Sequence, residues 1–182
     1  MLDQTAVAVV EEGYTPDPES FAQLVRENQA MVFSLALHSL RDPSLAEEIA
    51  QDVFLELHRR LSSLESRQHV RNWLRKVTAN RCIDQSRRRR VRPQVALEEV
   101  AEPAAPPGHD DPMRDALLRR LVAVLPEKDR MIVILRYQED LGLEEIAATL
   151  DMPVRAVKAH LHKGLETLRG KLSRVMETRR ER

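Results

Sequence analysis

The chain has 182 residues, of which 29 are basic and 29 are acidic, so its formal net charge is zero. Its hydrophobic content of 42% suffices for one ordinary domain or two small ones. The single cysteine, Cys82, excludes an internal disulfide and fits a reducing compartment. The N-terminus lacks the basic start of a signal peptide, and no apolar run approaches the ~20 residues of a membrane helix. We therefore expect a cytoplasmic protein that is not inserted in a membrane.

Residues 20–92, the first half of the chain, have the periodicity of three helices. Apolar positions recur at intervals of three and four between Phe21 and Leu40 and again between Leu45 and Leu57. Asp42 is a plausible N-cap for the second of these helices, with Pro43 at its first position. A polar segment at residues 62–69 predicts a loop before the third helix. Residues 1–19 precede this pattern and are expected to form a flexible tail.

Residues 93–112 read "PQVALEEVAEPAAPPGHDDP", with five prolines, five acidic residues and no Lys or Arg. Proline removes backbone donors and blocks helices, so this segment is predicted to be a flexible acidic linker. Residues 113–182, the second half, are again helical in pattern. The prediction is an all-α protein in which two small helical domains flank the linker.

Residues 143–162, "LEEIAATLDMPVRAVKAHLH", contain two helical stripes separated by three residues. The small Ala147 and apolar residues at 146, 150, 157 and 161 are expected to fix the crossing, as in a helix-turn-helix. Asp151 stands where glycine is common, and Asp tolerates a left-handed backbone. The exposed side of the second helix suits a reader of the DNA major groove. This groove-facing set comprises Arg155, Lys158, Ala159 and His162. The alternative is a plain helical hairpin with a solvated face.

A dense basic run occupies residues 71–92, with nine basic residues and one acidic residue, Asp84. Like charges at this density repel one another, which favours an anionic partner, usually nucleic acid, over a solubilising role. In helical projection Asn80 and Asp84 continue the apolar stripe that contains Trp73 and Val77. We assign Trp73 to core packing and Asp84 to pairing with a nearby Arg.

Four segments in this order resemble the conserved regions of the sigma-70 family of bacterial sigma factors, in its smallest, extracytoplasmic-function group (group IV). "FSLALHSLRDPSLAEEIAQDVFLELHRRL" resembles region 2.1–2.2, and "VRNWLRKVTANRCIDQSRRRR" resembles region 2.3–2.4. "LVAVLPEKDRMIVILRYQEDLGLEEIAATL" resembles region 4.1, and "DMPVRAVKAHLHKGLETLRGKL" resembles region 4.2. The resemblance covers nearly all of residues 21–172.

The resemblance implies an RNA polymerase sigma factor that directs promoter-specific initiation, commonly in a stress or envelope response and under an anti-sigma factor. Its partners would be core RNA polymerase and promoter DNA. The implied polymerase contacts are Glu48, Gln51, Asp52 and Phe54. The implied contacts to the single-stranded −10 element are Arg67, Gln68, Arg71, Asn80, Arg81, Arg87 and Arg88. The implied contacts to the −35 duplex are the groove-facing set with His160 and Lys163.

Two departures and one hypothesis accompany this assignment. The family often has Arg where His160 and Leu165 stand, so the −35 preference is not transferable. The linker acids Glu98, Glu99, Glu102, Asp110 and Asp111 are hypothesised to occupy basic RNA-binding surface in the polymerase cleft.

Two rival functions remain open from the sequence, namely a free-standing helix-turn-helix regulator and a sigma-like decoy that titrates an anti-sigma factor. The sigma-like first half disfavours the regulator, and its intact basic run disfavours the decoy. An enzyme is the weakest option, because the chain lacks metal-ligand spacing, a phosphate-binding glycine loop and a nucleophile motif. No cofactor and no metal are predicted.

Overall fold

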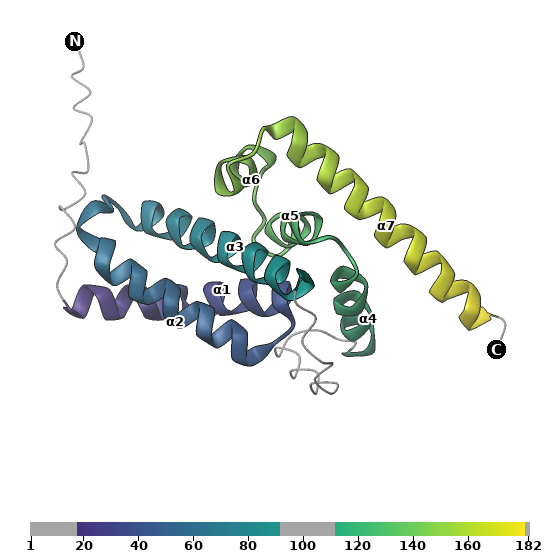
Figure 1. Ribbon diagram of the computed structural model, residues 1–182, viewed down its shortest axis with the longest axis horizontal. Helices are drawn as coiled ribbons and strands as arrows, with labels where there is room; N and C mark the ends of the chain where they lie inside the picture. Colours follow the sequence, from purple (N-terminus) through teal and green to yellow (C-terminus); the bar gives the residue numbers. More distant parts are fainter. Residues whose placement is uncertain (1–17, 92–111, 181–182) are drawn as a thin grey trace, which may run out of the picture.

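The structure, a computed structural model, describes residues 18–91 and 112–180 (Figure 1). Over these residues it has seven α-helices, one 3-10 turn and no strand, which confirms the all-α prediction. The elements are α1 (Pro18–Leu40), α2 (Pro43–Arg60), η1 (Leu61–Ser63), α3 (Arg67–Val91), α4 (Pro112–Ala123), α5 (Glu127–Tyr137), α6 (Leu143–Leu150) and α7 (Val154–Arg180). No helix in the two described ranges is long and apolar enough to cross a membrane. Nearly all of the predicted tail and linker lies outside the described residues.

Helix α2 begins where the sequence predicts. The backbone of Asp42 is extended, and its Oδ1 accepts a hydrogen bond from the Leu45 N–H at 3.0 Å. Such an N-cap stabilises a helix by about 0.5–2 kcal/mol. One face of α2 is buried against α1 and α3, through Leu45, Ala46, Ile49, Val53 and Leu57.

Helix α3 differs from the prediction at its start and on its faces. It already begins at Arg67, so Arg67 and Gln68 lie in its first turn and not in a loop. The face buried in the first bundle contains Val70, Leu74, Thr78, Ala79, Cys82 and Ile83. Asn80 and Asp84 were expected on the core-facing line, and this was wrong because both are exposed on the opposite side of the helix. Within the described residues Asp84 has no ion-pair partner, contrary to its assignment.

The second half is built around α5, which is buried along most of its length. Helices α6 and α7 are separated by the predicted three-residue turn, in which Asp151 is left-handed (φ 52°, ψ 50°). Ile146, Ala147, Leu150 and Val157 are buried at the crossing, as predicted. Helix α7 passes close to α5 at Gly164, where a Cβ atom would lie 3.3 Å from Val133 Cγ2.

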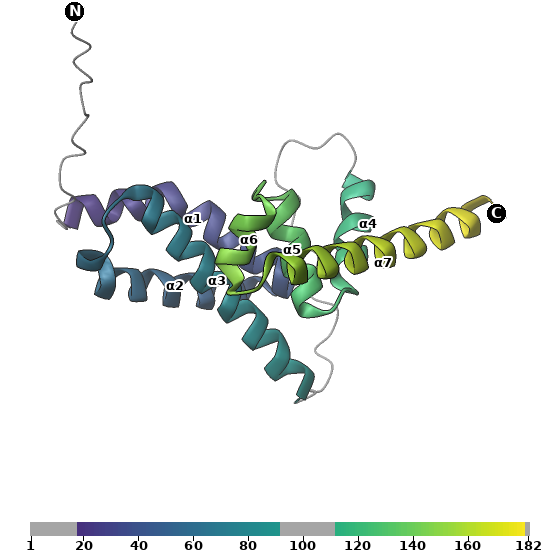
Figure 2. The same cartoon turned by 90° about the horizontal axis from the view of Figure 1, so that it is seen from above.

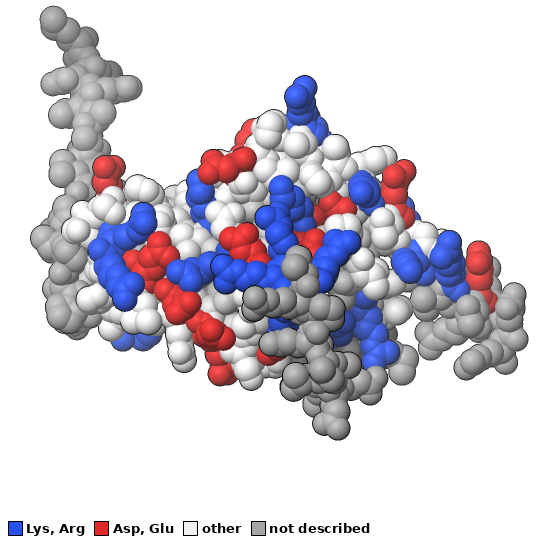
Figure 3. Space-filling model, in the orientation of Figure 1, with Lys and Arg blue, Asp and Glu red and all other residues white. Residues whose placement is uncertain are grey.

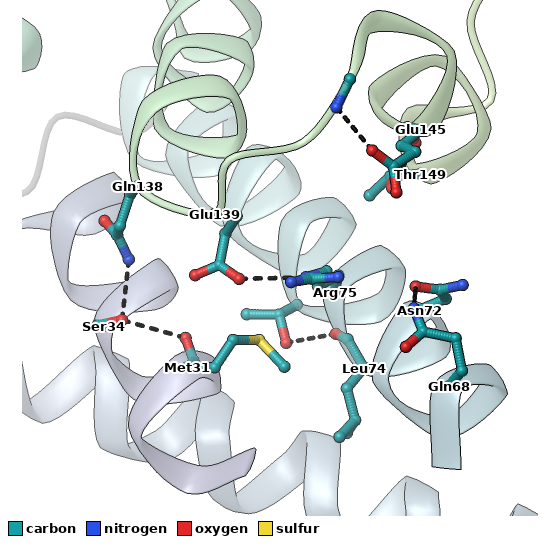
Figure 4. Close-up of polar contacts among 12 residues, drawn as sticks. Met31, Ser34, Gln68, Asn72, Leu74, Arg75, Gln138, Glu139, Glu145 and Thr149 are labelled. Atoms are coloured by element: carbon teal, nitrogen blue, oxygen red, sulfur yellow. Dashed lines mark hydrogen bonds and ion pairs between the residues drawn. The ribbon is translucent and has the colours of Figure 1, made fainter. Parts of the chain in front are cut away.

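The two halves pack directly against each other, with α5 and α6 lying over α1 and α3 (Figure 2). Arg75 on α3 and Glu139, just after α5, form an ion pair of 3.1 Å in which both side chains are less than a tenth exposed. Gln138 Nε2 donates to Ser34 Oγ at 2.9 Å, and both contacts are drawn in Figure 4. Arg130 donates to the Ser39 carbonyl at 2.6 Å, in the last turn of α1. We refer to this packing as the closed arrangement.

Candidate functional site

An open, largely apolar groove of about 1020 Å³ runs between α1 and α2. Gln51 and Phe54, two of the four residues expected to contact the polymerase, line this groove. Glu48 and Asp52 are exposed beside it on α2. Sequence reasoning missed the rest of the lining, which consists of Phe21, Val25, Gln29, Ala30, Phe33, Glu47, Ala50, Leu55 and His58.

Leu55 is the most exposed large apolar residue of this groove, at 58% exposure. A signal for it existed in the sequence, because the buried Val53 and Leu57 lie two positions away and therefore point to the other side of α2. Phe21 and His58 both line the groove, and their rings meet edge-on at a centroid distance of 5.0 Å. An exposed apolar patch with a polar rim is typical of a protein-interaction surface.

The residues expected at the −10 element are distributed along α3 rather than gathered at one point. Arg67 and Arg88 are about 30 Å apart at 1.5 Å per residue. Arg71, Asn80, Arg87 and Arg88 are exposed. Arg67 is paired with Glu27 of α1 at 2.7 Å, and Gln68 Nε2 donates to Asn72 Oδ1 at 3.0 Å. In Figure 3, Lys and Arg side chains extend across the face that includes α3, with Asp and Glu among them.

Arg81 connects the expected DNA face with the expected polymerase face. Its guanidinium pairs with Asp52 at 2.9 Å and with Glu56 at 2.8 Å, and its side chain is 36% exposed. Both carboxylates belong to α2, so these two pairs hold Arg81 against α2. A contact between Arg81 and a phosphate requires that these two pairs weaken.

The side of α3 that bears Trp73 and Asn80 faces a cleft of about 600 Å³ between the two halves. Helix α3 contributes His69, Asn72, Trp73, Lys76, Val77 and Asn80 to this cleft, and α2 contributes Glu56 and Arg60. The opposite wall consists of Leu141, Glu145, Ala148 and Thr149. Trp73 and Val77 are therefore only partly buried and belong to the interface between the halves as much as to the first bundle.

The groove-facing set of α7 lies at the surface. Arg155, Lys158, Ala159 and His162 are exposed, as is Lys163. Val157 and Leu161, which lie between them in the sequence, pack inward on α5 and α6. The first turns of α7 thus present donors at intervals of three and four residues on a helix supported from behind.

His160 is placed differently from the other predicted −35 residues. Its Nδ1 lies 2.6 Å from Asp129 Oδ1 on α5, and its side chain is 35% exposed. One ring nitrogen is thus used to fix α7 on α5, and only the other is available for a phosphate. Asp129 was missed by sequence reasoning, because an acidic residue in the first turn of a helix is usual in itself.

Comparisons with known proteins agree with this geometry. Residues 24–92 match Sigma-70 region 2, and residues 115–168 match Sigma-70 region 4. The chain is 28% identical over 171 residues to the ECF RNA polymerase sigma factor SigW of Bacillus subtilis, covering 86% of this chain and 90% of the relative. It is 30% identical over 152 residues to the RNA polymerase sigma-E factor of Streptomyces coelicolor, covering 84% of this chain and 85% of that relative.

Solved structures share the fold. One is the sigma factor RpoE in complex with the anti-sigma factor NepR from Bartonella quintana, with a TM-score of 0.70 and 21% identity over 85% of this chain and 98% of that chain. Another is CnrH in complex with the cytosolic domain of CnrY, with a TM-score of 0.64 and 19% identity. This match covers 86% of this chain and 90% of that chain.

Two helical halves that match regions 2 and 4 in order define a sigma-70 family protein. The chain belongs to this family and, within it, to the extracytoplasmic-function group of RNA polymerase sigma factors.

Proposed function

We propose that the first half binds core RNA polymerase and holds the single-stranded −10 element, while α7 recognises the −35 element as duplex. This proposal rests on the groove-facing set. Its four residues are exposed on the first turns of α7, whose opposite face is packed against the core. A major groove admits such a helix, and Arg or Lys donates to guanine edges and phosphates. The matches to regions 2 and 4 support the same division of labour between the two halves.

The α1–α2 groove is the proposed polymerase surface. Phe54 and the exposed Leu55 give this groove apolar surface, and Gln51 adds a polar group beside it. Apolar centres with polar rims are usual in protein interfaces. The chain would work in the cytoplasm, as a specificity subunit with no catalytic activity of its own. We expect Leu55→Asp to weaken core binding at least tenfold, because it puts a charge into a surface that must be desolvated.

An anti-sigma factor is the proposed regulator. Two solved relatives of the same fold are described in complexes with such partners or with a partner's cytosolic domain. A partner that occupies the α1–α2 groove would compete directly with the polymerase, so Leu55→Asp is expected to weaken both complexes.

Promoter-dependent transcription with bacterial core RNA polymerase over genomic fragments tests the proposal. Specific transcripts should appear only when the protein is added. They should be lost with the double variant Arg71→Ala/Asn80→Ala. Arg59→Ala, which removes an exposed charge from α2, is the matched control and should remain active. A protein that shifts duplex DNA without binding core polymerase would instead be a free-standing regulator. One that binds an anti-sigma factor but directs no transcription would be a decoy.

A further inference from the structure

The α1–α2 groove opens beside the point at which the described chain begins. Helix α1 starts at Pro18, and Phe21, in its first turn, already lines the groove. The lining contributed by α1 continues through Val25 to Phe33, a rise of about 18 Å at 1.5 Å per residue. The edge-on contact between Phe21 and His58 lies at the same end as Pro18. The chain that precedes Pro18 is therefore tethered at one end of a largely apolar surface.

The preceding chain contains an apolar stretch whose length matches that of the groove. Residues 1–17 lie outside the described residues and read "MLDQTAVAVVEEGYTPD". Residues 6–10, "AVAVV", are the apolar stretch, and five extended residues span about 17 Å. The seven residues that connect this stretch to α1 span up to about 24 Å and include Gly13 and Pro16, which are residue types that favour turns. The apolar stretch can therefore reach back along the groove from Pro18.

The charge beside this part of the groove is opposite to that of the connecting residues. Glu11 and Glu12 lie between the apolar stretch and the start of α1. Arg26 is exposed one turn before the lining residue Ala30 and has no ion-pair partner among residues 18–91 and 112–180. Residues four apart share a helix face, so Arg26 lies beside the groove. Glu47, the one acidic residue of the lining, is in the first half of α2, towards the other end. Attraction to Arg26 therefore favours entry of the two glutamates from the Pro18 end.

We propose that residues 6–10 occupy the α1–α2 groove of the free protein and compete with core RNA polymerase for it. This inference rests on the proposed role of the groove in polymerase binding. The apolar stretch would cover Phe54 and the exposed Leu55. A weak contact suffices, because a segment on a short linker has an effective concentration in the millimolar range. Polymerase binds only those molecules whose groove is empty, so its apparent affinity is lowered.

Disulfide trapping in the full chain tests the docking without polymerase. Val9→Cys is combined either with Gln29→Cys, which lines the groove, or with Gln23→Cys, which is exposed on α1 outside the lining. A segment that does not dock reaches residue 23 at least as readily as residue 29, because the entropic cost of closing a loop grows with its length. With oxidised glutathione we expect the pair at residues 9 and 29 to form its intramolecular disulfide at least fivefold faster. Burial raises the pKa of Cys82 to about 12, so the native thiol should not compete.

Two results of this experiment would overturn the proposal. Equal rates for the two cysteine pairs would mean that the segment does not prefer the groove. Disulfide-linked dimers of Val9→Cys/Gln29→Cys, formed in place of the intramolecular bond, would mean that the groove holds the segment of a second copy.

The affinity for core polymerase tests the competition. Val7→Asp/Val9→Asp places two charges in the apolar stretch, and Gln4→Asp/Thr15→Asp adds the same charge at polar positions as a matched control. The first variant should bind core polymerase about fivefold more tightly than wild type, the gain expected if the groove is empty in about a fifth of wild-type molecules. The control should bind like wild type.

The outcomes separate this inference from the proposed function. Preferential trapping at residue 29 together with an unchanged affinity of Val7→Asp/Val9→Asp would refute the competition. Failure of wild type and both charge variants to bind core polymerase would refute the proposed function of the groove, and the trapping rates would still decide whether residues 6–10 occupy it.

Discussion

The imidazole Nδ1 of His160 lies 2.6 Å from Oδ1 of Asp129 and joins the DNA-facing part of α7 to α5. The Asp129 side chain is only 3% exposed, and its Oδ2 has no hydrogen-bond partner among the described residues. Within residues 18–91 and 112–180, the bond to His160 is thus the one side-chain hydrogen bond of this buried carboxylate. The pair fixes the angle at which the groove-facing set is presented.

Replacing His160 should therefore affect stability more than DNA contacts. We expect His160→Ala to lower the free energy of unfolding by about 1–3 kcal/mol, because it leaves a buried acceptor unsatisfied. Urea denaturation measures this. His162→Ala is the control, since His162 is 71% exposed and should change stability by less than about 0.5 kcal/mol while weakening −35 binding. Equal losses of stability in the two variants would show that the Asp129 contact is not stabilising.

Local features were predictable from the sequence, and contacts between distant elements were not. The cap at Asp42 and the left-handed Asp151 follow from residue type and position, and both were found as predicted. His160 was expected to contact the −35 duplex because its segment resembles region 4.2 of the family. Its partner lies 31 residues away, and no local pattern identifies a contact of that kind.

The polarity of α3 was the main error, and it has a physical cause. A single helix packed on two sides has two apolar faces, and the stripe through Trp73 and Val77 was taken for the face buried in the first bundle. That stripe instead faces α6, so Asn80 lies at the exposed edge of an interface between the halves and Asp84, one turn further on, is exposed. The flanking linker gave no indication that the halves would pack together.

Arg155 is the residue most suited to a base contact on α7. If Arg155 donates to a base edge, Arg155→Ala should weaken the binding free energy for the specific −35 duplex by about 1–3 kcal/mol. Binding to unrelated duplex should change little. Competition assays with specific and non-specific duplex at one salt concentration measure the difference. Arg169→Ala, an exposed charge farther along α7, is the control. A uniform loss on all sequences would assign Arg155 to a phosphate.

Asp151 has two separable roles, as a left-handed residue and as the partner of Lys76. Asp151→Gly and Asp151→Ala both remove the carboxylate, but only Ala is strained at φ 52°. We expect Ala to be less stable than Gly by about 1 kcal/mol in urea denaturation. Similar stabilities of the two variants would mean that the turn relaxes around Ala.

Asp42 should make stability depend on pH. The hydrogen bond from Arg89, followed by that from the Leu45 N–H, lowers the pKa of Asp42 below its ordinary value of 3.8. Because the folded pKa is the lower one, this stabilisation is fully present above about pH 5 and is lost as the pH falls through the folded pKa. Arg89 is 43% exposed, so the ion pair itself should contribute less than about 1 kcal/mol.

Asp42→Asn keeps a capping side chain but removes this charge, so the comparison isolates the electrostatic part of the cap. Urea midpoints of wild type and Asp42→Asn should differ at pH 7 and converge as the pH falls through the lowered pKa of Asp42. In an Arg89→Ala background the pH 7 difference should shrink, because the first cause of the lowered pKa is gone. A difference that stays constant over the whole acid titration would mean that the carboxylate stabilises α2 through its shape and hydrogen bond alone, without its charge.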